Sequence, residues 1–188
     1  MPDRTQIRLE LAYLIVTGTT TAPRALELAR ALLELVPQVL TLMTPNAARV
    51  IAPRDLSAIT GTRLIESYFD EAILPRPPEG LVMVAPCSFN SLNKLAAGVA
   101  DNLALSLVAE AIGRLTPVVV APSLNAPLLC HPLTSASMAA LRGWGVSVVD
   151  PEDDGSGPRL ARTEVIVAEA ARRLASWRPA SGFPGRAP

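Results

Sequence analysis

Residues 81–103 read LVMVAPCSFNSLNKLAAGVADNL, and this stretch contains the transition that decides the fold. The apolar run Leu81–Ala85 predicts an interior strand, because short apolar runs bounded by turn residues are typical of buried strands. The strand is followed at once by the small polar residues Cys87, Ser88, Asn90, Ser91 and Asn93. A helical pattern begins within the same stretch. Polar groups at the end of a buried strand must be hydrogen-bonded by the protein or by a ligand. The stretch therefore predicts a strand-to-helix turn that is able to hold a ligand.

The same alternation of apolar runs and helical patterns continues along the chain. The expected strands are Ala12–Val16, Val39–Met43, Leu81–Ala85, Val118–Ala121 and Val146–Val149, with a weaker one at Arg63–Glu66. The expected helices are Ala22–Leu35, Leu92–Leu115 with a break near Gly98–Asp101, Ser135–Arg142 and Thr163–Ser176. Strands that alternate with helices predict a parallel sheet covered on both faces. The expected fold is α/β, a Rossmann-like (flavodoxin-like) three-layer sandwich.

Composition narrows the class of protein. The 188 residues predict one domain over residues 1–176, followed by a disordered tail over residues 177–188. The net charge is zero, which argues against a nucleic-acid partner, and no apolar stretch reaches the ~18 residues of a membrane span. The two cysteines provide no disulfide framework, and no leader pattern is found, so a cytoplasmic location is expected. A single histidine, His131, excludes a His-rich metal site.

Two stretches are expected to be irregular. The segment Pro75–Gly80 contains three prolines, which lack backbone donors and have a fixed φ. The segment Asp150–Pro158 is acidic and rich in glycine, and we expect it to be mobile.

In an open parallel sheet, ligands bind beyond the carboxyl ends of the strands, so the residues that follow each strand are the candidates for a site. The first strand is followed by Gly18 and three threonines, a turn that suits a phosphate at a helix N-terminus. Helix capping alone is the competing interpretation of these hydroxyls. Thr44, Ser123 and Asn125 follow other strands, and almost no charge accompanies them. Such a rim suits a neutral, polar, planar ligand with one anionic tail.

Two motifs identify a family. Residues 85–91 (APCSFNS), followed by Lys94 and by the run 100–103 (ADNL), resemble the PASANT motif of the homo-oligomeric flavin-containing cysteine decarboxylases. Residues 122–129 (PSLNAPLL) resemble the second motif of that family, PxMNxxMW, and residues 18–20 match its phosphate turn. The two motifs occur in the family's order and spacing, and the resemblance covers residues 10 to 170, roughly.

The resemblance implies an FMN site and a substrate site. The cofactor-binding residues carried over from the family are Gly18, Thr19, Thr20, Thr44, Ser88, Phe89, Asn90, Ser91 and Ser123. Asn125 matches the asparagine that binds the substrate's carboxylate. No metal is implied. The family also implies a homo-oligomer, either a trimer or a multiple of three up to a dodecamer, or a mixed oligomer with a homologue.

The chain departs from the family at two places that matter for activity. The family has a catalytic histidine thirteen residues before the alanine that corresponds to Ala85, and this chain has Ala72 there. Because the family histidine is absent, the catalytic residue of this chain is unknown. Loss of a general base commonly costs ~10²–10⁴-fold in rate. Phosphopantothenoylcysteine decarboxylases also carry a lid cysteine, which residues 150–162 lack, although Gly155–Leu160 resembles a lid.

These departures leave three functions open. The first is FMN-dependent oxidative decarboxylation of a peptide's C-terminal cysteine to an enethiol, in the biosynthesis of a modified peptide. The second is a flavin-binding subunit that lacks the base and works with a competent partner. The third is a flavoprotein with a different redox reaction. Whether the chain is an enzyme on its own therefore stays open. His131 is interpreted as the cap of a helix that starts near Pro132, and Cys87 as a small packed residue.

Overall fold

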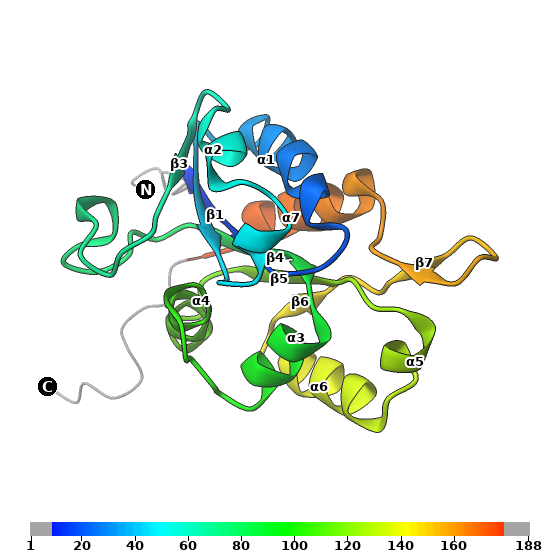
Figure 1. The fold of residues 1–188 in the computed structure, drawn as a ribbon. Helices are drawn as coiled ribbons and strands as arrows, with labels where there is room; N and C mark the ends of the chain where they lie inside the picture. The colour runs from blue at the N-terminus through cyan, green and yellow to red at the C-terminus, as the bar shows by residue number, and fades with distance from the viewer. Residues whose placement is uncertain (1–8, 179–188) are drawn as a thin grey trace, which may run out of the picture.

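The computed structural model describes residues 9–178 and contains a six-stranded, all-parallel sheet (Figure 1). The strands are β1 (Leu11–Val16), β2 (Gln38–Met43), β3 (Thr62–Leu64), β4 (Leu81–Cys87), β5 (Val118–Pro122) and β6 (Ser147–Val148). Their order is β3-β2-β1-β4-β5-β6, which is the doubly wound order of the Rossmann fold. The order reverses between β1 and β4, and a crevice opens at such a point. The predicted α/β fold class is confirmed.

Helices cover both faces of the sheet, as Figure 1 shows. One layer contains α1 (Ala25–Leu33), α2 (Pro53–Ser57) and α7 (Thr163–Ser176), and the other contains α3 (Phe89–Ala96), α4 (Leu103–Gly113) and α6 (Pro132–Gly143). Short helical turns are η1 (Ala22–Arg24), η2 (Ala47–Arg49), η3 (Glu71–Ile73) and α5 (Ala126–Leu129). The predicted break between α3 and α4 is present, with Gly98 at a φ of 71°. The helices α2 and α5 were not predicted, because four or five residues carry little periodic signal.

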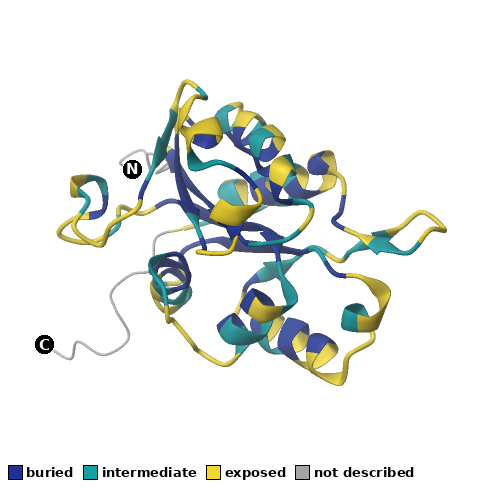
Figure 2. Cartoon of the chain, in the orientation of Figure 1, coloured by how far each residue is buried: buried dark blue, intermediate teal, exposed yellow. Residues whose placement is uncertain are grey.

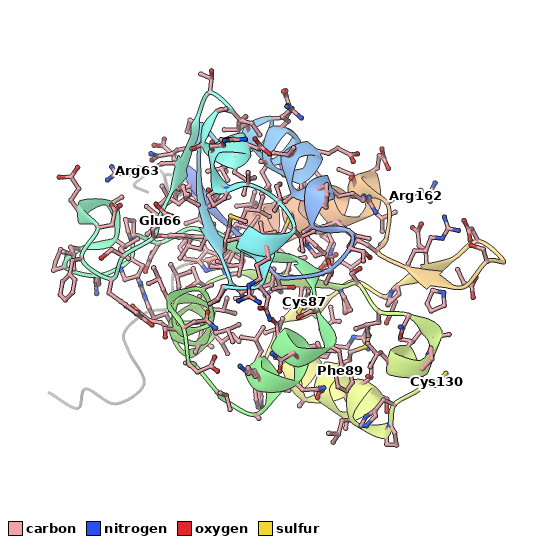
Figure 3. The ribbon with its side chains drawn as sticks, in the orientation of Figure 1. Arg63, Glu66, Cys87, Phe89, Cys130 and Arg162 are labelled. Carbon is pink, nitrogen blue, oxygen red and sulfur yellow. The ribbon has the colours of Figure 1, made fainter. Side chains whose placement is uncertain are left out.

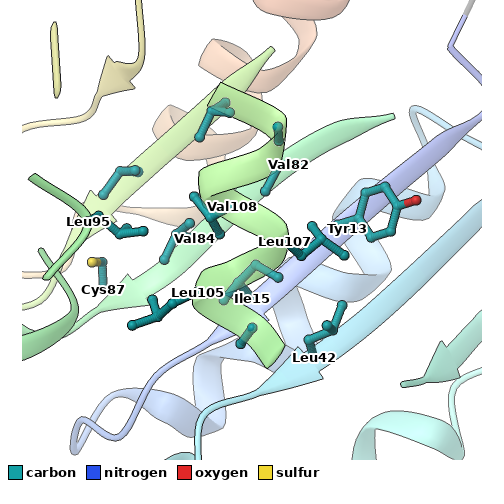
Figure 4. Close-up of a cluster of buried hydrophobic side chains, with 14 of the residues drawn as sticks. Tyr13, Ile15, Leu42, Val82, Val84, Cys87, Leu95, Leu105, Leu107 and Val108 are labelled. Carbon is teal, nitrogen blue, oxygen red and sulfur yellow. The ribbon is translucent and has the colours of Figure 1, made fainter. Parts of the chain in front are cut away.

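The sheet is buried on both sides (Figure 2), and its strands divide their side chains between two cores. Tyr13 and Ile15 of β1 join one core with Val108 of α4, which Figure 4 shows in close-up. Leu14 of the same strand joins the other core with Leu28 of α1. Full burial of each large side chain contributes ~1.5–3 kcal/mol. The continuous apolar runs of the sequence reflect this two-sided burial.

A β-hairpin forms within the segment that was expected to be mobile. Its strands are β7 (Glu152–Asp153) and β8 (Pro158–Arg159), and it projects from the body at the right of Figure 1. Asp153 Oδ1 accepts hydrogen bonds from the backbone N–H groups of Gly155 (2.8 Å) and Gly157 (3.1 Å). Both glycines have a positive φ, a backbone conformation that other residues rarely adopt. The expectation of an irregular segment is therefore corrected: the acidic and glycine residues build a specific turn.

The proline-rich segment Pro75–Gly80 is irregular, as predicted, and it is fixed at the amino end of the sheet. The hydroxyl of Tyr13 donates to the carbonyl of Pro78 at 2.8 Å, and Arg114 donates to the carbonyl of Pro77 at 2.7 Å. Residues 66–74 precede this anchor and form a projecting loop at the left of Figure 1.

Of the predicted disordered tail, residues 177–188, the structure describes only Trp177 and Arg178. The indole N–H of Trp177 donates to the carbonyl of Leu115 at 3.3 Å, so Trp177 is fixed to the body. Residues 179–188 lie outside the described residues. Within residues 9–178, no helix has the length and apolar character needed to cross a membrane.

Candidate functional site

A cavity of about 960 Å³ lies at the carboxyl ends of the strands, around the point where the strand order reverses. Ligand sites in proteins commonly measure ~300–1,000 Å³. All ten residues predicted for cofactor and substrate line this one cavity: Gly18, Thr19, Thr20, Thr44, Ser88, Phe89, Asn90, Ser91, Ser123 and Asn125. The residues come from four strand ends, so the sheet topology alone brings them together.

Thr17 fixes the centre of the site. Its fully buried hydroxyl donates to the carbonyl of Pro86 at 2.8 Å and accepts from the backbone N–H of Ser88 at 2.8 Å. These two bonds join the end of β1 to the end of β4. Residues 17–21, called here the threonine turn, and the helix α3 therefore start from one rigid point.

Gly18 allows the threonine turn to lie against the end of β2. A Cβ atom at Gly18 would lie 2.6 Å from Asn46 Cβ and 2.8 Å from the Asn46 carbonyl carbon. Contacts below 3.0 Å are not tolerated, and backbone atoms cannot rotate out of the way. Only glycine fits here, and the close approach lets the two strand ends form one wall of the cavity.

The hydroxyls of the threonine turn do not cap a helix, which removes the capping-only interpretation. Thr21 occupies the N-cap of η1 without a capping bond from its side chain. Instead its Oγ1 lies 3.0 Å from Thr19 Oγ1 and 2.7 Å from Ser123 Oγ. A chain of three hydroxyls thus runs along the cavity from the end of β1 to the end of β5.

The polar residues after β4 divide into three roles. Ser88 caps α3, because its Oγ accepts from the backbone N–H of Ser91 at 3.2 Å. Asn93 faces the α3–α6 contact, where its Oδ1 accepts from the Ser137 hydroxyl at 2.7 Å. Asn90 is exposed on the cavity, and its side chain makes no hydrogen bond to the described part of the chain. The side chains of Ser88 and Asn93 thus have partners within the protein, whereas the amide of Asn90 is available to a ligand.

Asn125 combines a capping role with a free amide. Its Oδ1 accepts from the backbone N–H of Leu128 at 3.1 Å and caps α5, which leaves its NH₂ group to donate. Apolar side chains complete this part of the cavity: Leu105, Leu124 and Leu128. A planar, largely apolar ring with polar edges is compatible with such a lining.

Four charged residues line the cavity, and none of them was predicted as a site residue: Arg24, Lys94, Asp101 and Arg159. Lys94 and Asp101 form an ion pair, and the hydrogen bond from Lys94 holds the pKa of the Asp101 carboxyl below its usual value. Arg24 donates to the carbonyl of Leu160 at 3.1 Å and to Thr163 Oγ1 at 3.0 Å. The cavity is thus cationic in balance. Thr21, which joins two strand ends, belongs to the predicted turn but was not among the predicted cofactor-binding residues.

A family model described as Flavoprotein matches residues 4–175. The chain belongs to the Flavoprotein family. This flavoprotein is 30% identical over 175 residues to a probable phosphopantothenoylcysteine decarboxylase from Streptococcus mutans, covering 86% of this chain and 97% of the relative. It is 27% identical to a coenzyme A biosynthesis bifunctional protein CoaBC from Thermococcus kodakarensis, covering 86% of this chain. The chain spans only 41% of that bifunctional relative.

Solved structures share the fold of this flavoprotein. The FMN binding protein AtHal3 superposes with a TM-score of 0.77 at 19% identity, covering 91% of this chain and 100% of that one. The peptidyl-cysteine decarboxylase EpiD superposes with a TM-score of 0.71 at 18% identity, covering 86% and 98% of the two chains. At these identities the superpositions show the fold alone.

Ala72, the position of the family histidine, does not line the cavity of its own chain. Its backbone N–H donates to Asp70 Oδ1 at 2.8 Å, and the same oxygen accepts from Arg63, labelled in Figure 3, at 2.7 Å. Asp70 is therefore held both by Arg63 of β3 and by the backbone of its own loop. Ala72 itself is half-buried and packs against the core of its own chain.

The described lining of the cavity contains no cysteine and no histidine. Cys87 is fully buried, and burial raises the pKa of its thiol, as expected of a packed residue. His131 caps α6, because its Nδ1 accepts from the backbone N–H of Leu133 at 3.1 Å, and its ring contacts that of Phe89 edge-on at 5.1 Å. The structural interpretations of both residues agree with these contacts. Cys130 is exposed near α5 (Figure 3) and does not line the cavity.

Proposed function

We propose that this flavoprotein binds FMN in the cavity at the strand ends. The observation that carries the proposal is the threonine turn, whose hydroxyls line the cavity instead of capping a helix. The turn suits the phosphate, and Thr44 supports it from β2. Ser88, Phe89, Asn90, Ser91 and Ser123 suit the ring and the ribityl chain. The similarity to AtHal3, an FMN binding protein, supports this cofactor.

The proposed reaction is oxidative decarboxylation of a C-terminal cysteine. FMN, when bound, supplies the two-electron acceptor for oxidation of the cysteinyl side chain. The free amide of Asn125 is placed to donate to the substrate's carboxylate, which holds the cysteine in the cavity. The carboxylate leaves as carbon dioxide, and the product is an enethiol that is lighter than the substrate by carbon dioxide and two hydrogens.

A peptide ending in cysteine is the proposed substrate. A cysteine in the lid would be needed to reduce the enethiol, and neither the hairpin nor the rest of the described cavity lining contains one. The similarity to EpiD, a peptidyl-cysteine decarboxylase, supports this choice. The relatives named as a probable phosphopantothenoylcysteine decarboxylase and as CoaBC favour the coenzyme A precursor instead, so the two substrates are to be compared directly by mass spectrometry.

A second candidate function is a flavin-binding subunit that works with a competent partner, and the absence of a suitable base favours it. Asp101 is the carboxylate of the described cavity lining, and its ion pair with Lys94 makes it a poor proton acceptor for a thiol. A flavoprotein with a different redox reaction is the third candidate. In each case we propose a cytoplasmic protein with one flavoprotein domain over residues 1–176.

Asn90→Ala is expected to weaken FMN binding by about 1–3 kcal/mol, the range for loss of a buried hydrogen bond. Asn90 makes no side-chain bond to the described chain, so its loss leaves the fold intact. The measurement is a titration with FMN followed by flavin fluorescence. Asn93→Ala on the same helix is the matched control: it removes the bond from Ser137 and should lower the melting temperature without a specific effect on FMN. Equal FMN affinity of Asn90→Ala and wild type would contradict the assignment.

The projecting loop supports an assembly of several chains, which we propose to be a trimer or a multiple of three. It exposes three large apolar side chains, with Tyr68 at 52%, Phe69 at 86% and Leu74 at 48% exposure. Apolar clusters of this kind are typical of surfaces that another chain covers. Light scattering should give a mass of three chains or a multiple, and Phe69→Asp should lower that mass. A monomer with FMN bound would contradict the proposal.

A further inference from the structure

We propose that Arg159 binds a phosphate monoester in the cavity, carried there by the β7–β8 hairpin. The proposal rests on the proposed function insofar as FMN is the expected bearer of that phosphate. Arg159 lies on β8 and lines the cavity. Its Nη1 meets Asp154 Oδ2 at 2.9 Å, and its Nη2 donates to the hydroxyl of Ser156. Neither Asp154 nor Ser156 lines the cavity, so both side-chain partners of Arg159 lie outside the cavity that Arg159 itself lines.

The base of the hairpin is tied to the threonine turn. Arg24 lies in η1, directly after that turn, and it donates to the carbonyl of Leu160 at 3.1 Å. The other branch of its guanidinium donates to Thr163 Oγ1 at 3.0 Å, at the start of α7. Because Leu160 is the next residue after Arg159, Arg159 stands at the end of the cavity where the turn lies. The phosphate proposed for the turn therefore falls within the region that Arg159 lines.

The charges of the cavity favour a ligand with two negative charges. Lys94 is balanced by Asp101, whereas the branches of Arg24 are bonded to neutral oxygens, with Glu27 3.9 Å from its Nε. Neither Glu27 nor Asp154 lines the cavity. A phosphate monoester carries about 1.5–2 negative charges at pH 7, and arginine binds its oxygens through two parallel bonds.

The present partner of Arg159 is easily exchanged. Arg159 and Asp154 are 57% and 54% exposed in their side chains, and exposed ion pairs contribute little to stability. A phosphate shielded from water by the cavity offers a stronger partner, because charge-assisted bonds gain strength where water is excluded. The hairpin is thus expected to turn Arg159 from Asp154 toward the phosphate when the ligand binds.

The test compares FMN with riboflavin, which lacks only the phosphate. Arg159→Gln is expected to weaken FMN about 10-fold or more and to leave riboflavin unchanged, as measured by flavin fluorescence and calorimetry. Arg162→Gln is the matched control, because Arg162 (labelled in Figure 3) has the same charge, pairs with Glu152 at 3.2 Å and does not line the cavity. Asp154→Asn, which removes the competing carboxylate, is expected to bind FMN at least as tightly as wild type.

A second arm decides which molecule bears the phosphate. The FMN-saturated protein is titrated with phosphopantothenoylcysteine and with its dephosphorylated form. If Arg159→Gln weakens only the phosphorylated thiol, the phosphate site is real and belongs to the substrate. The proposal is overturned if Arg159→Gln changes neither ligand, or if it weakens riboflavin as much as FMN. If wild type binds no flavin, the proposed function fails separately, and calorimetry with inorganic phosphate on wild type and Arg159→Gln decides the role of Arg159.

Discussion

Gly18→Ala is expected to raise the dissociation constant for FMN by about 10- to 100-fold, corresponding to the ~1–3 kcal/mol that an overpacked site costs. The added Cβ would lie 2.8 Å from the Asn46 carbonyl carbon, so the threonine turn has to move away from the end of β2. That movement displaces Thr19 and Thr44 relative to each other, and these are the residues proposed to hold the phosphate. Because the displaced residues are those proposed to bind the phosphate, and riboflavin has no phosphate, riboflavin should lose less affinity than FMN.

Gly113→Ala provides the control for the change of residue type. Gly113 ends α4, and no atom lies within 4 Å of the position that its Cβ would occupy. Alanine is favoured over glycine in a helix by about 0.5–1 kcal/mol, so this variant should be as stable as wild type or more stable, with unchanged FMN binding. If the Gly18→Ala variant binds FMN as tightly as wild type, the close approach of the two strand ends is not needed for FMN binding.

The strand-end residues could be predicted because the topology of a parallel sheet brings its carboxyl ends together. Thr44, Ser88 and Asn125 are far apart in the sequence, yet each lies within a few residues of the end of a predicted strand, and the structure places all three around one cavity. No side-chain detail is needed for this inference. The family motifs then assigned to these positions a ligand and roles that the geometry fits.

The charged residues of the cavity could not be predicted in the same way. Arg24 reaches the cavity from η1, Asp101 from the connection between α3 and α4, and Arg159 from a hairpin. Their positions depend on tertiary bonds such as that from Arg24 to the carbonyl of Leu160, which leave no periodic signal in the sequence. The hairpin itself was hidden because its strands have two residues each, and its acidic, glycine-rich composition resembles that of a mobile loop.

The position of Ala72 relative to the cavity could not be predicted from sequence spacing. Counting residues places Ala72 at the family's catalytic position, but the structure places it in a loop outside its own chain's cavity. We propose that a histidine at position 72 would act across a contact between chains. The exposed side chains of Tyr68 and Phe69 on the same loop support such a contact. Activity and assembly are therefore coupled in the proposed function, and one substitution tests both.

Ala72→His is expected to raise turnover of a peptide ending in cysteine by about 10²–10⁴-fold, the usual contribution of a general base. The base must be neutral to accept the thiol proton, so the gain should appear as the pH rises through ~6.5, the ordinary pKa of histidine. The measurement is mass spectrometry of the peptide, which detects loss of carbon dioxide and two hydrogens. Asn125 supports a competent site, because its amide is free to bind the carboxylate.

Two further variants test whether the gain depends on the position of the new histidine. Glu71→His puts the imidazole on the neighbouring, 88% exposed residue and should give little gain. Ala72→His combined with Phe69→Asp should lose the gain along with the assembly, because the imidazole then has no neighbouring cavity to face. If wild type already reacts at a rate that Ala72→His does not improve, the missing-base argument is wrong, and Asp70, Glu71 or the substrate itself takes the proton. If neither wild type nor Ala72→His reacts while both bind FMN, the flavin-binding subunit becomes the better account than the decarboxylase. The flavin site would then be intact and the base restored, so the missing component would be a partner or a different substrate.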